Sequence, residues 1–240
     1  MGIADTAAEL RAIAREADDA TGYFPALYSR VTARIAESIA AGRFDDGPRM
    51  ERFATTFASY YVRAFRNDIP RPRCWQATWD VAGDGALLIV QHLLLGINAH
   101  VNHDLPLAVV DVARGAGGLA SVHDDFLAVN AVLAETYNGV LRDLDRVSRW
   151  TNEAAALGGG RSFNFSLRVA RDQAWDAAGR LFPLDADGSA AYAAELDRLV
   201  SVLAFLVTRP VFPLRLLVPL ARRLEQRDPR TVTAALLGSP

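Results

Sequence analysis

Apolar residues recur along most of the chain at the three- and four-residue spacing of amphipathic helices, without convincing strand alternation. Thr6 and Glu9 fit a capping box at the start of the first such stretch. Pro25 opens a second stretch, and Gly42 ends it. The pattern predicts an all-α protein, a single irregular bundle of about nine to ten helices around a buried central helix.

The central helix is expected over residues 87–105, LLIVQHLLLGINAHVNHDL, which are apolar overall yet hold three of the four histidines. A helix that is apolar enough to be buried carries such groups only where each has a partner. Pro106 is expected to end or kink the helix at about Asp104, because its ring clashes with the Asn102 carbonyl. Gly96 indicates that another helix, or a ligand, approaches closely there.

The length suits one large domain, and we expect a single domain over residues 1–240. The clearest internal break is the glycine run at 158–160, which marks a possible sub-boundary. Both sides of this break have helical patterns.

The polar residues of the central helix fall on two faces. At about 100° per residue, His103 lies about 20° from His92, while His100 and Asp104 lie about 80° and 120° away. The other face carries three amides, Gln91, Asn98 and Asn102. His92 and His100 are about 12 Å apart along the axis and cannot share one metal ion, whereas His100 and Asp104 are neighbours.

A second histidine–carboxylate stretch follows at residues 121–126, SVHDDF. The preceding GAGG turn is expected to bring His123 and Asp125 near His100 and Asp104. These four residues form a predicted ligand set for one divalent metal ion. His100 is the predicted general base or metal ligand, which carboxylates orient. A structural interpretation stays open, because helix dipoles favour histidines in a last turn and aspartates in a first turn.

Arg171 and Trp175 are four residues apart on one predicted helix, so guanidinium and indole can stack. They are interpreted either as a structural pair or as groups that bind an anionic or planar ligand. Together with His100 and Asp104, Arg171 is predicted to be catalytic, and it would bind a charged group of the substrate. The other residues expected to line the pocket are His92, Asn98, Asn102, Asn130 and Trp175. Alternatively, His92 is a hydrogen-bonded core histidine and the amides tie down backbone in a loop.

Composition removes several classes of function. All 26 basic residues are arginines, which excludes Schiff-base lysines, a pyridoxal-phosphate lysine and a P-loop lysine. Cys74 is the only cysteine, so an internal disulfide is not possible, and we exclude a thiolate zinc site. We interpret Cys74 as a small core residue. A net charge of -2 gives no basic footprint for nucleic acid.

The N-terminal residues are charged and amphipathic, unlike a signal peptide, and the chain has no apolar run of about 18 uncharged residues. We therefore expect no transmembrane segment and a cytoplasmic location. The stretch PVFPLRLLVPLARRLEQR, residues 210–227, is expected to pack in the core or to form a dimer contact, so a homodimer is possible. The alternative is a position on a membrane surface, which three prolines disfavour.

Several segments together resemble one family: QHLLLGINAHVNHDL, YFPALYSRVT, FDDGPRMERFA, DDFLAVNAVL and RVARDQAWDAA. This family is common in actinobacteria and is described only as a domain of unknown function. The resemblance covers most of the chain and implies an all-helical fold, but no activity. It directs attention to nine polar or aromatic residues: His92, Asn98, His100, Asn102, Asp104, Asp125, Asn130, Arg171 and Trp175.

The spacing Gly96-x-x-x-His100-x-x-x-Asp104 is also similar to a zinc-binding helix of bacterial zinc-dependent phospholipase C and of fungal single-strand nucleases. Those all-helical enzymes draw further histidines from other helices, and this chain has none before His92. The resemblance therefore implies one ion at most.

Three functional hypotheses follow. The first is an enzyme that acts on a small organic molecule by His/Asp acid–base or single-metal chemistry in a helical pocket. The second is a non-catalytic protein that binds a small-molecule ligand. The third is a structural helical scaffold whose buried polar groups satisfy one another. The cofactor is unknown, with one divalent metal ion as the candidate.

Overall fold

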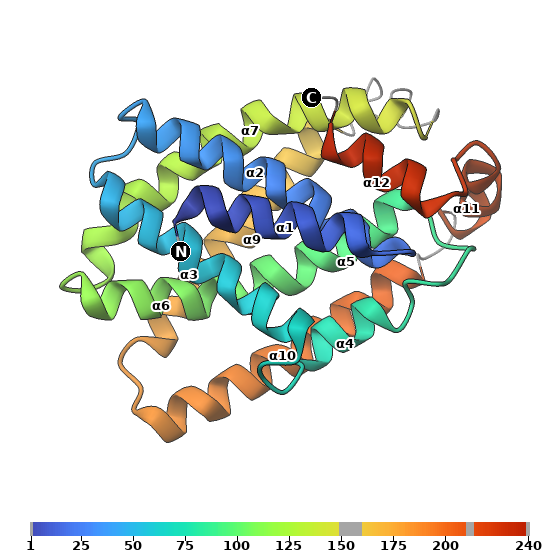
Figure 1. Ribbon diagram of the computed structural model, residues 1–240. Coiled ribbons are helices and arrows are strands. Elements are labelled where there is room, and N and C mark those ends of the chain that lie inside the picture. Colours follow the sequence, from blue (N-terminus) through green and yellow to red (C-terminus); the bar gives the residue numbers. More distant parts are fainter. Residues whose placement is uncertain (1, 149–159, 210–213, 239–240) are drawn as a thin grey trace.

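The computed structural model describes residues 2–148, 160–209 and 214–238, and over these residues the chain is all-α (Figure 1). No strand occurs in these ranges, where Ser148 and Glu225 form an isolated antiparallel bridge. The predicted all-α bundle is confirmed. The expected sub-boundary near 158–160 lies outside the described residues, apart from Gly160.

The described α-helices are α1 (Ile3–Glu16), α2 (Tyr23–Ala40), α3 (Gly47–Arg66), α4 (Arg73–Trp79), α5 (Ile89–Ala99), α6 (Leu105–Gly115), α7 (His123–Asp145), α9 (Gly160–Leu181), α10 (Ala186–Thr208), α11 (Leu214–Arg223) and α12 (Pro229–Leu237). Short 3-10 turns η1 (Ala20–Gly22) and η3 (Leu119–Val122) precede α2 and α7. A π-helical segment, η2 (His100–Asp104), joins α5 to α6.

The line α5–η2–α6 runs through the middle of the bundle (Figure 1). Helices α2, α4 and α10 pack against α5, while α3 and α9 pack against α6. Helix α2 also contacts α1, α7 and α12. Neighbours on several sides explain why an apolar central helix is buried almost all round.

The first helix begins earlier than the capping pattern indicated. Its N-cap is Gly2, whose backbone N–H donates to the Asp5 carboxylate at 3.0 Å. Thr6 lies inside the helix, where its buried hydroxyl donates to the Gly2 carbonyl at 3.0 Å. The predicted box at Thr6 and Glu9 was therefore wrong, because Asp5 supplies a closer acceptor for the free N-terminal N–H.

The central helix continues past Asp104, so of the two predicted outcomes at Pro106, an end or a kink, the end was wrong. Leu105 keeps helical angles (φ -62°, ψ -46°), and its N–H donates to the His100 carbonyl five residues back. Pro106 occupies the first turn of α6, where its missing N–H is tolerated. The chain therefore stays helical through Pro106, after a π turn in which Leu105 bonds five residues back.

Gly96 marks a close helix crossing, as predicted. A Cβ built at Gly96 would lie 2.5 Å from Cγ of Phe24, whose ring comes from α2. Phe24 also stacks on Tyr28 at 5.5 Å and meets Tyr61 and Trp75 at 5.2 and 5.3 Å between ring centroids. An aromatic core therefore lies directly against the central helix.

Among the described residues, no single helix has both the length and the apolar character needed to cross a membrane. Two segments, Ile89–Gly115 and Leu119–Thr136, meet that test only together and are bent by 109° relative to each other.

Candidate functional site

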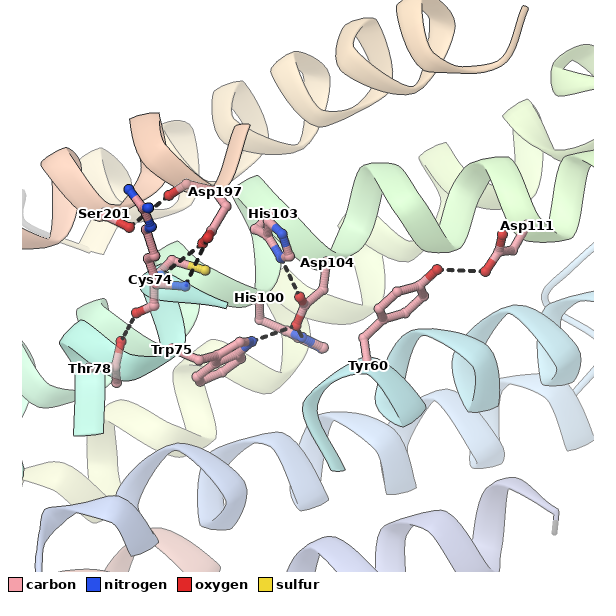
Figure 2. A network of polar contacts seen from close by, with 11 residues as sticks. Tyr60, Cys74, Trp75, Thr78, His100, His103, Asp104, Asp111, Asp197 and Ser201 are labelled. Carbon is pink, nitrogen blue, oxygen red and sulfur yellow. Dashed lines mark hydrogen bonds and ion pairs between the residues drawn. The ribbon is translucent and has the colours of Figure 1, made fainter. Parts of the chain in front are cut away.

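Asp104 is the centre of the most concentrated polar cluster on the central helix (Figure 2). Its carboxylate is 1% exposed. One oxygen accepts hydrogen bonds from Trp75 Nε1 and His100 Nδ1, both at 2.9 Å, and the other accepts from His103 Nδ1 at 2.7 Å. Three side-chain donors replace the water that a buried carboxylate has lost.

The π segment places the three charged or titratable groups of this cluster within five residues. His100 and Asp104 are four residues apart, His103 is adjacent to Asp104, and α4 adds Trp75 from the side. Single π turns inside α-helices occur frequently at functional sites. The His100–Asp104 pair that the spacing predicted is therefore formed.

The environment moves the pKa values of the two histidines in opposite directions. Burial lowers the pKa of His100 and outweighs its hydrogen bond to Asp104. Burial also opposes the charge on His103, but the hydrogen bond and the charge of Asp104 raise the pKa of His103 overall. Burial works against ionisation of Asp104, and the hydrogen bonds from both histidines lower its pKa. Asp104 is therefore ionised and His100 neutral near pH 7.

Aromatic rings enclose His100. Its imidazole stacks on Phe57 with a centroid distance of 3.6 Å and an interplanar angle of 9°. Tyr28 and Phe24 meet it edge-on at 4.5 and 5.4 Å. Its Nε2 is buried and has no hydrogen-bond partner among the described residues, and the same is true of the Tyr61 hydroxyl. Unpaired buried polar atoms of this kind need an explanation.

A second group of ligand-type atoms adjoins Asp104 through His103. One atom each of Cys74, His103 and Asp197 lie within 4.8 Å of one another. Figure 2 shows the Cys74 sulfur beside the Asp197 carboxylate, with the His103 ring between this pair and Asp104. No motif could reveal this group, because α4, η2 and α10 are far apart in sequence. The exclusion of a thiolate zinc site rested on there being a single cysteine. That argument was too broad, since a ligand set that combines thiolate, imidazole and carboxylate needs only one cysteine.

The structure places the other two expected metal ligands elsewhere. Asp125 accepts hydrogen bonds from the backbone N–H groups of Asp45 and Asp46 at 2.7 and 3.3 Å, and from Arg49 at 2.7 Å. His123 is substantially exposed, 3.5 Å from the Asp124 carboxylate. Among the described residues, the four expected ligands do not form a converging group of three or more.

Arg171 is buried, with 3% exposure, and joins α9 to α7. Its Nε donates to the Asn130 side chain at 2.8 Å, and its Nη2 donates to the Phe126 carbonyl at 2.7 Å. The guanidinium lies 4.2 Å above the Phe126 ring rather than on Trp175, which packs against His123 and Phe126. Burial lowers the pKa of Arg171 to about 10, which leaves it cationic at neutral pH.

The amide side chains on one face of the central helix form hydrogen bonds that hold α10 in place. Gln91 Nε2 donates to the Val207 carbonyl at 2.8 Å, and Asn98 Nδ2 donates to the Val200 carbonyl at 3.0 Å. Asn102 Nδ2 donates to the Asn98 side-chain oxygen at 2.9 Å. These amides therefore tie down backbone, as the alternative interpretation expected, although the backbone is helical rather than a loop.

His92 lies apart from the Asp104 cluster, in edge-on contact with Tyr23 at 5.8 Å between centroids. Burial lowers the pKa of His92 to about 4, so its ring is neutral at physiological pH. These features fit a core histidine.

Fold and site together define an all-helical protein with a buried histidine–carboxylate centre on a π-interrupted central helix. A model for a family of unknown function, DUF5995, matches residues 3–210, and the chain belongs to that family. No curated protein and no solved structure matches the chain.

Proposed function

We propose that this protein is an enzyme that acts on a small organic molecule, with His100 as general base and Asp104 as the residue that orients it. A neutral imidazole that donates through Nδ1 to a carboxylate presents an unprotonated Nε2, which is the atom that accepts a proton in histidine–carboxylate catalysis. The chemistry is acid–base, with or without a single metal ion.

One observation carries this proposal: Nε2 of His100 is buried without a partner while Nδ1 is held by Asp104 at 2.9 Å. A purely structural histidine would be expected to use both ring nitrogens. The flat contact with Phe57 and the edges of Tyr28 and Phe24 fix the ring plane, so Nε2 has a defined direction. A general base needs a free nitrogen with a defined direction, and it must also lie within hydrogen-bond reach of the substrate proton.

The proposed role of Arg171 toward substrate charge stays a prediction. Its contacts with Asn130 and Phe126 support a positioning role, in which it holds α7 against α9. The proposed pocket roles of His92, Asn98 and Asn102 are likewise predictions. A cytoplasmic location also stays a prediction.

The experiment compares two purified variants with the wild type. A defined mixture of small metabolites is incubated with wild-type protein, His100→Gln and His123→Gln, and its composition is followed by mass spectrometry. We expect wild type and His123→Gln to consume the same metabolite and His100→Gln to consume it at least about 100-fold more slowly, because general bases contribute about that much or more. Equal consumption by folded His100→Gln and wild type would contradict the proposed base.

The second candidate is a non-catalytic binding protein, which the aromatic enclosure around His100 favours. Here the same metabolite mixture, applied one compound at a time, would raise the melting temperature without any compound being consumed. If no compound shifts the melting temperature and none is consumed, the scaffold hypothesis is favoured.

A further inference from the structure

We propose that Cys74, His103 and Asp197 bind one divalent transition-metal ion of the zinc class. This site differs from the ligand set expected from the sequence, which combined His100 and Asp104 with residues of α7. It does not depend on whether the protein is an enzyme.

The three ligand atoms already lie close enough for such an ion. They are within 4.8 Å of one another and come from α4, η2 and α10. Zinc binds thiolate at about 2.3 Å and imidazole or carboxylate at about 2.0 to 2.2 Å, so tetrahedral ligands lie about 3.3 to 3.8 Å apart. Side-chain movements of about 1 Å or less would therefore close the site around an ion.

His103 has the second contact that metal-bound histidines usually have. Its Nδ1 is bonded to Asp104 at 2.7 Å, which leaves Nε2 for the ion. A carboxylate that accepts a hydrogen bond from a histidine ligand fixes the tautomer and the ring orientation. It also makes the other ring nitrogen more basic and so a stronger metal ligand. Asp104 is itself held by Trp75, so the support extends one residue further.

Asp197 is also held in place before any ion binds. One of its carboxylate oxygens accepts the Arg73 N–H at 2.8 Å and the other accepts the Cys74 N–H at 2.9 Å. Each oxygen keeps a further lone pair, so these bonds leave room for coordination. They also fix Asp197 beside the cysteine whose sulfur belongs to the same group.

The simplest alternative is that these residues lie together for structural reasons, without any metal ion. Asp197 satisfies the first N–H groups of α4, and a buried cysteine fills core space, so two of the three residues have structural roles. Neither role requires a histidine ring nitrogen within 4.8 Å of the sulfur and the carboxylate. The hydrogen bond to Asp104 gives Nδ1 of the buried His103 a structural role, but it does not account for the second ring nitrogen, which is the one available to an ion.

Binding is balanced in charge and protons. The Cys74 thiol loses its proton to solvent as the metal–sulfur bond forms, and protonated His103 likewise releases its Nε2 proton to solvent so that this nitrogen can bind the ion. Thiolate and carboxylate together offset the two charges of the ion. Three protein ligands leave one coordination position for water or another small ligand, as in catalytic zinc sites.

Cobalt(II) is the direct probe, because it occupies zinc sites and a cobalt–thiolate bond absorbs in the near ultraviolet. Since Cys74 is the only cysteine, such a band identifies its sulfur without a second candidate. Tag-free protein stripped of metal is titrated with cobalt(II) and then with zinc(II). We expect one equivalent to give the band and zinc to displace it.

Matched variants assign the other two ligands. His103→Gln and Asp197→Asn are expected to weaken cobalt binding at least 10-fold, and Cys74→Ser to abolish the near-ultraviolet band. His123→Gln is the control, because it removes an exposed histidine beside a carboxylate and is expected to leave affinity unchanged. Circular dichroism confirms that each variant is folded.

The proposal is overturned if folded wild type shows no thiolate band at millimolar cobalt(II). It is also overturned if His103→Gln and Asp197→Asn, whichever of them folds, bind with wild-type affinity. Either result would leave the proposed base untouched, since the metabolite experiment changes His100, which is not a ligand in this site.

Discussion

At the residue scale, Asp104 is the buried charge on which the polar contacts of the central helix converge. A carboxylate with 1% exposure is stable only because Trp75, His100 and His103 all donate to it. Removing the Asp104 carboxylate would leave three buried donors unpaired. This lowers stability more than replacing the whole cluster by apolar residues of similar volume would.

We therefore expect Asp104→Ala to lower the free energy of unfolding by about 3 to 5 kcal/mol, the range for removing one partner from a buried charged pair. Urea unfolding of metal-free protein, followed by circular dichroism, measures this. Asp124→Ala is the matched control, since the Asp124 side chain is 82% exposed and its loss should change stability by about 0.5 kcal/mol at most. A loss below about 1 kcal/mol for Asp104→Ala would contradict this account.

His92 makes a separate prediction about pH. Burial lowers its pKa to about 4, with smaller effects from Asp84 and Asp19, which raise it, and Arg222, which lowers it. A histidine in the unfolded chain titrates at about 6.5, so between these values the unfolded chain binds a proton that the folded chain does not. The contribution of His92 to the free energy of unfolding should therefore be largest above pH 6.5 and fall by about 3 kcal/mol as pH drops to about 4.

Equilibrium unfolding at several pH values, compared between wild type and His92→Gln, isolates this contribution. The difference between the two proteins should shrink or change sign between pH 6.5 and 4, because glutamine does not titrate. Parallel curves would show that His92 does not contribute to the acid sensitivity.

Contacts within one helix could be predicted from the sequence, and contacts between distant segments could not. His100 and Asp104 are four residues apart, so helical geometry alone pairs them. Asp125 binds Arg49 and the backbone just before α3, and Asp197 binds the start of α4. No periodicity along the chain reports such partners, because they depend on how the helices are packed.

At the element scale, the crossing of α2 and α5 depends on Gly96. A Cβ at this position would lie 2.5 to 2.7 Å from atoms of Phe24, closer than real contacts allow. Phe24 is itself packed against Tyr61 and Trp75, so it cannot move away freely. The helices would have to separate.

Gly96→Ala should therefore lower the free energy of unfolding by about 1 to 3 kcal/mol, the usual penalty of overpacking, despite alanine's better helix propensity. Gly179→Ala in α9 is the matched control, because a Cβ there meets nothing within 4 Å. That variant should be neutral or more stable by about 0.5 to 1 kcal/mol. Chemical denaturation of both proteins measures the contrast, and two equal shifts would argue against the crossing.

The helical pattern located the central helix but placed its end, or a kink, at Pro106. The rule that proline ends a helix assumes the α register, in which the ring meets the carbonyl four residues back. In η2 the Leu105 N–H instead bonds to the His100 carbonyl, and the helix continues. A change of register depends on contacts all round the helix, which local sequence rules do not include.

At the scale of the whole molecule, α10 buries one face against α4 and α5 and leaves apolar side chains exposed on the other. The exposed residues are Leu199, Val202, Leu203, Phe205 and Leu206. Large contiguous apolar patches are uncommon on the surfaces of monomers. This apolar face of α10 supports the proposal that two copies of the chain associate, although the sequence placed the possible dimer contact at residues 210–227.

We expect the wild type to be a dimer by size-exclusion chromatography with light scattering, and Leu199→Glu with Val202→Glu to be a folded monomer. Leu127→Glu on α7 is the control, since Leu127 is exposed away from α10. A wild type that stays monomeric at all concentrations would contradict this.

Because Cys74 is completely buried, its reaction with a thiol reagent also measures how often the structure opens around α4. A thiol reagent can reach this sulfur only when α4 separates from its neighbours, since the side chain has no exposure in the closed molecule. The rate at which wild-type protein is alkylated, divided by the rate for a free thiol, then gives the equilibrium constant for that separation. We expect the ratio to rise under mild denaturant well before the helices melt, and a ratio near one in buffer would mean that α4 is not held closed.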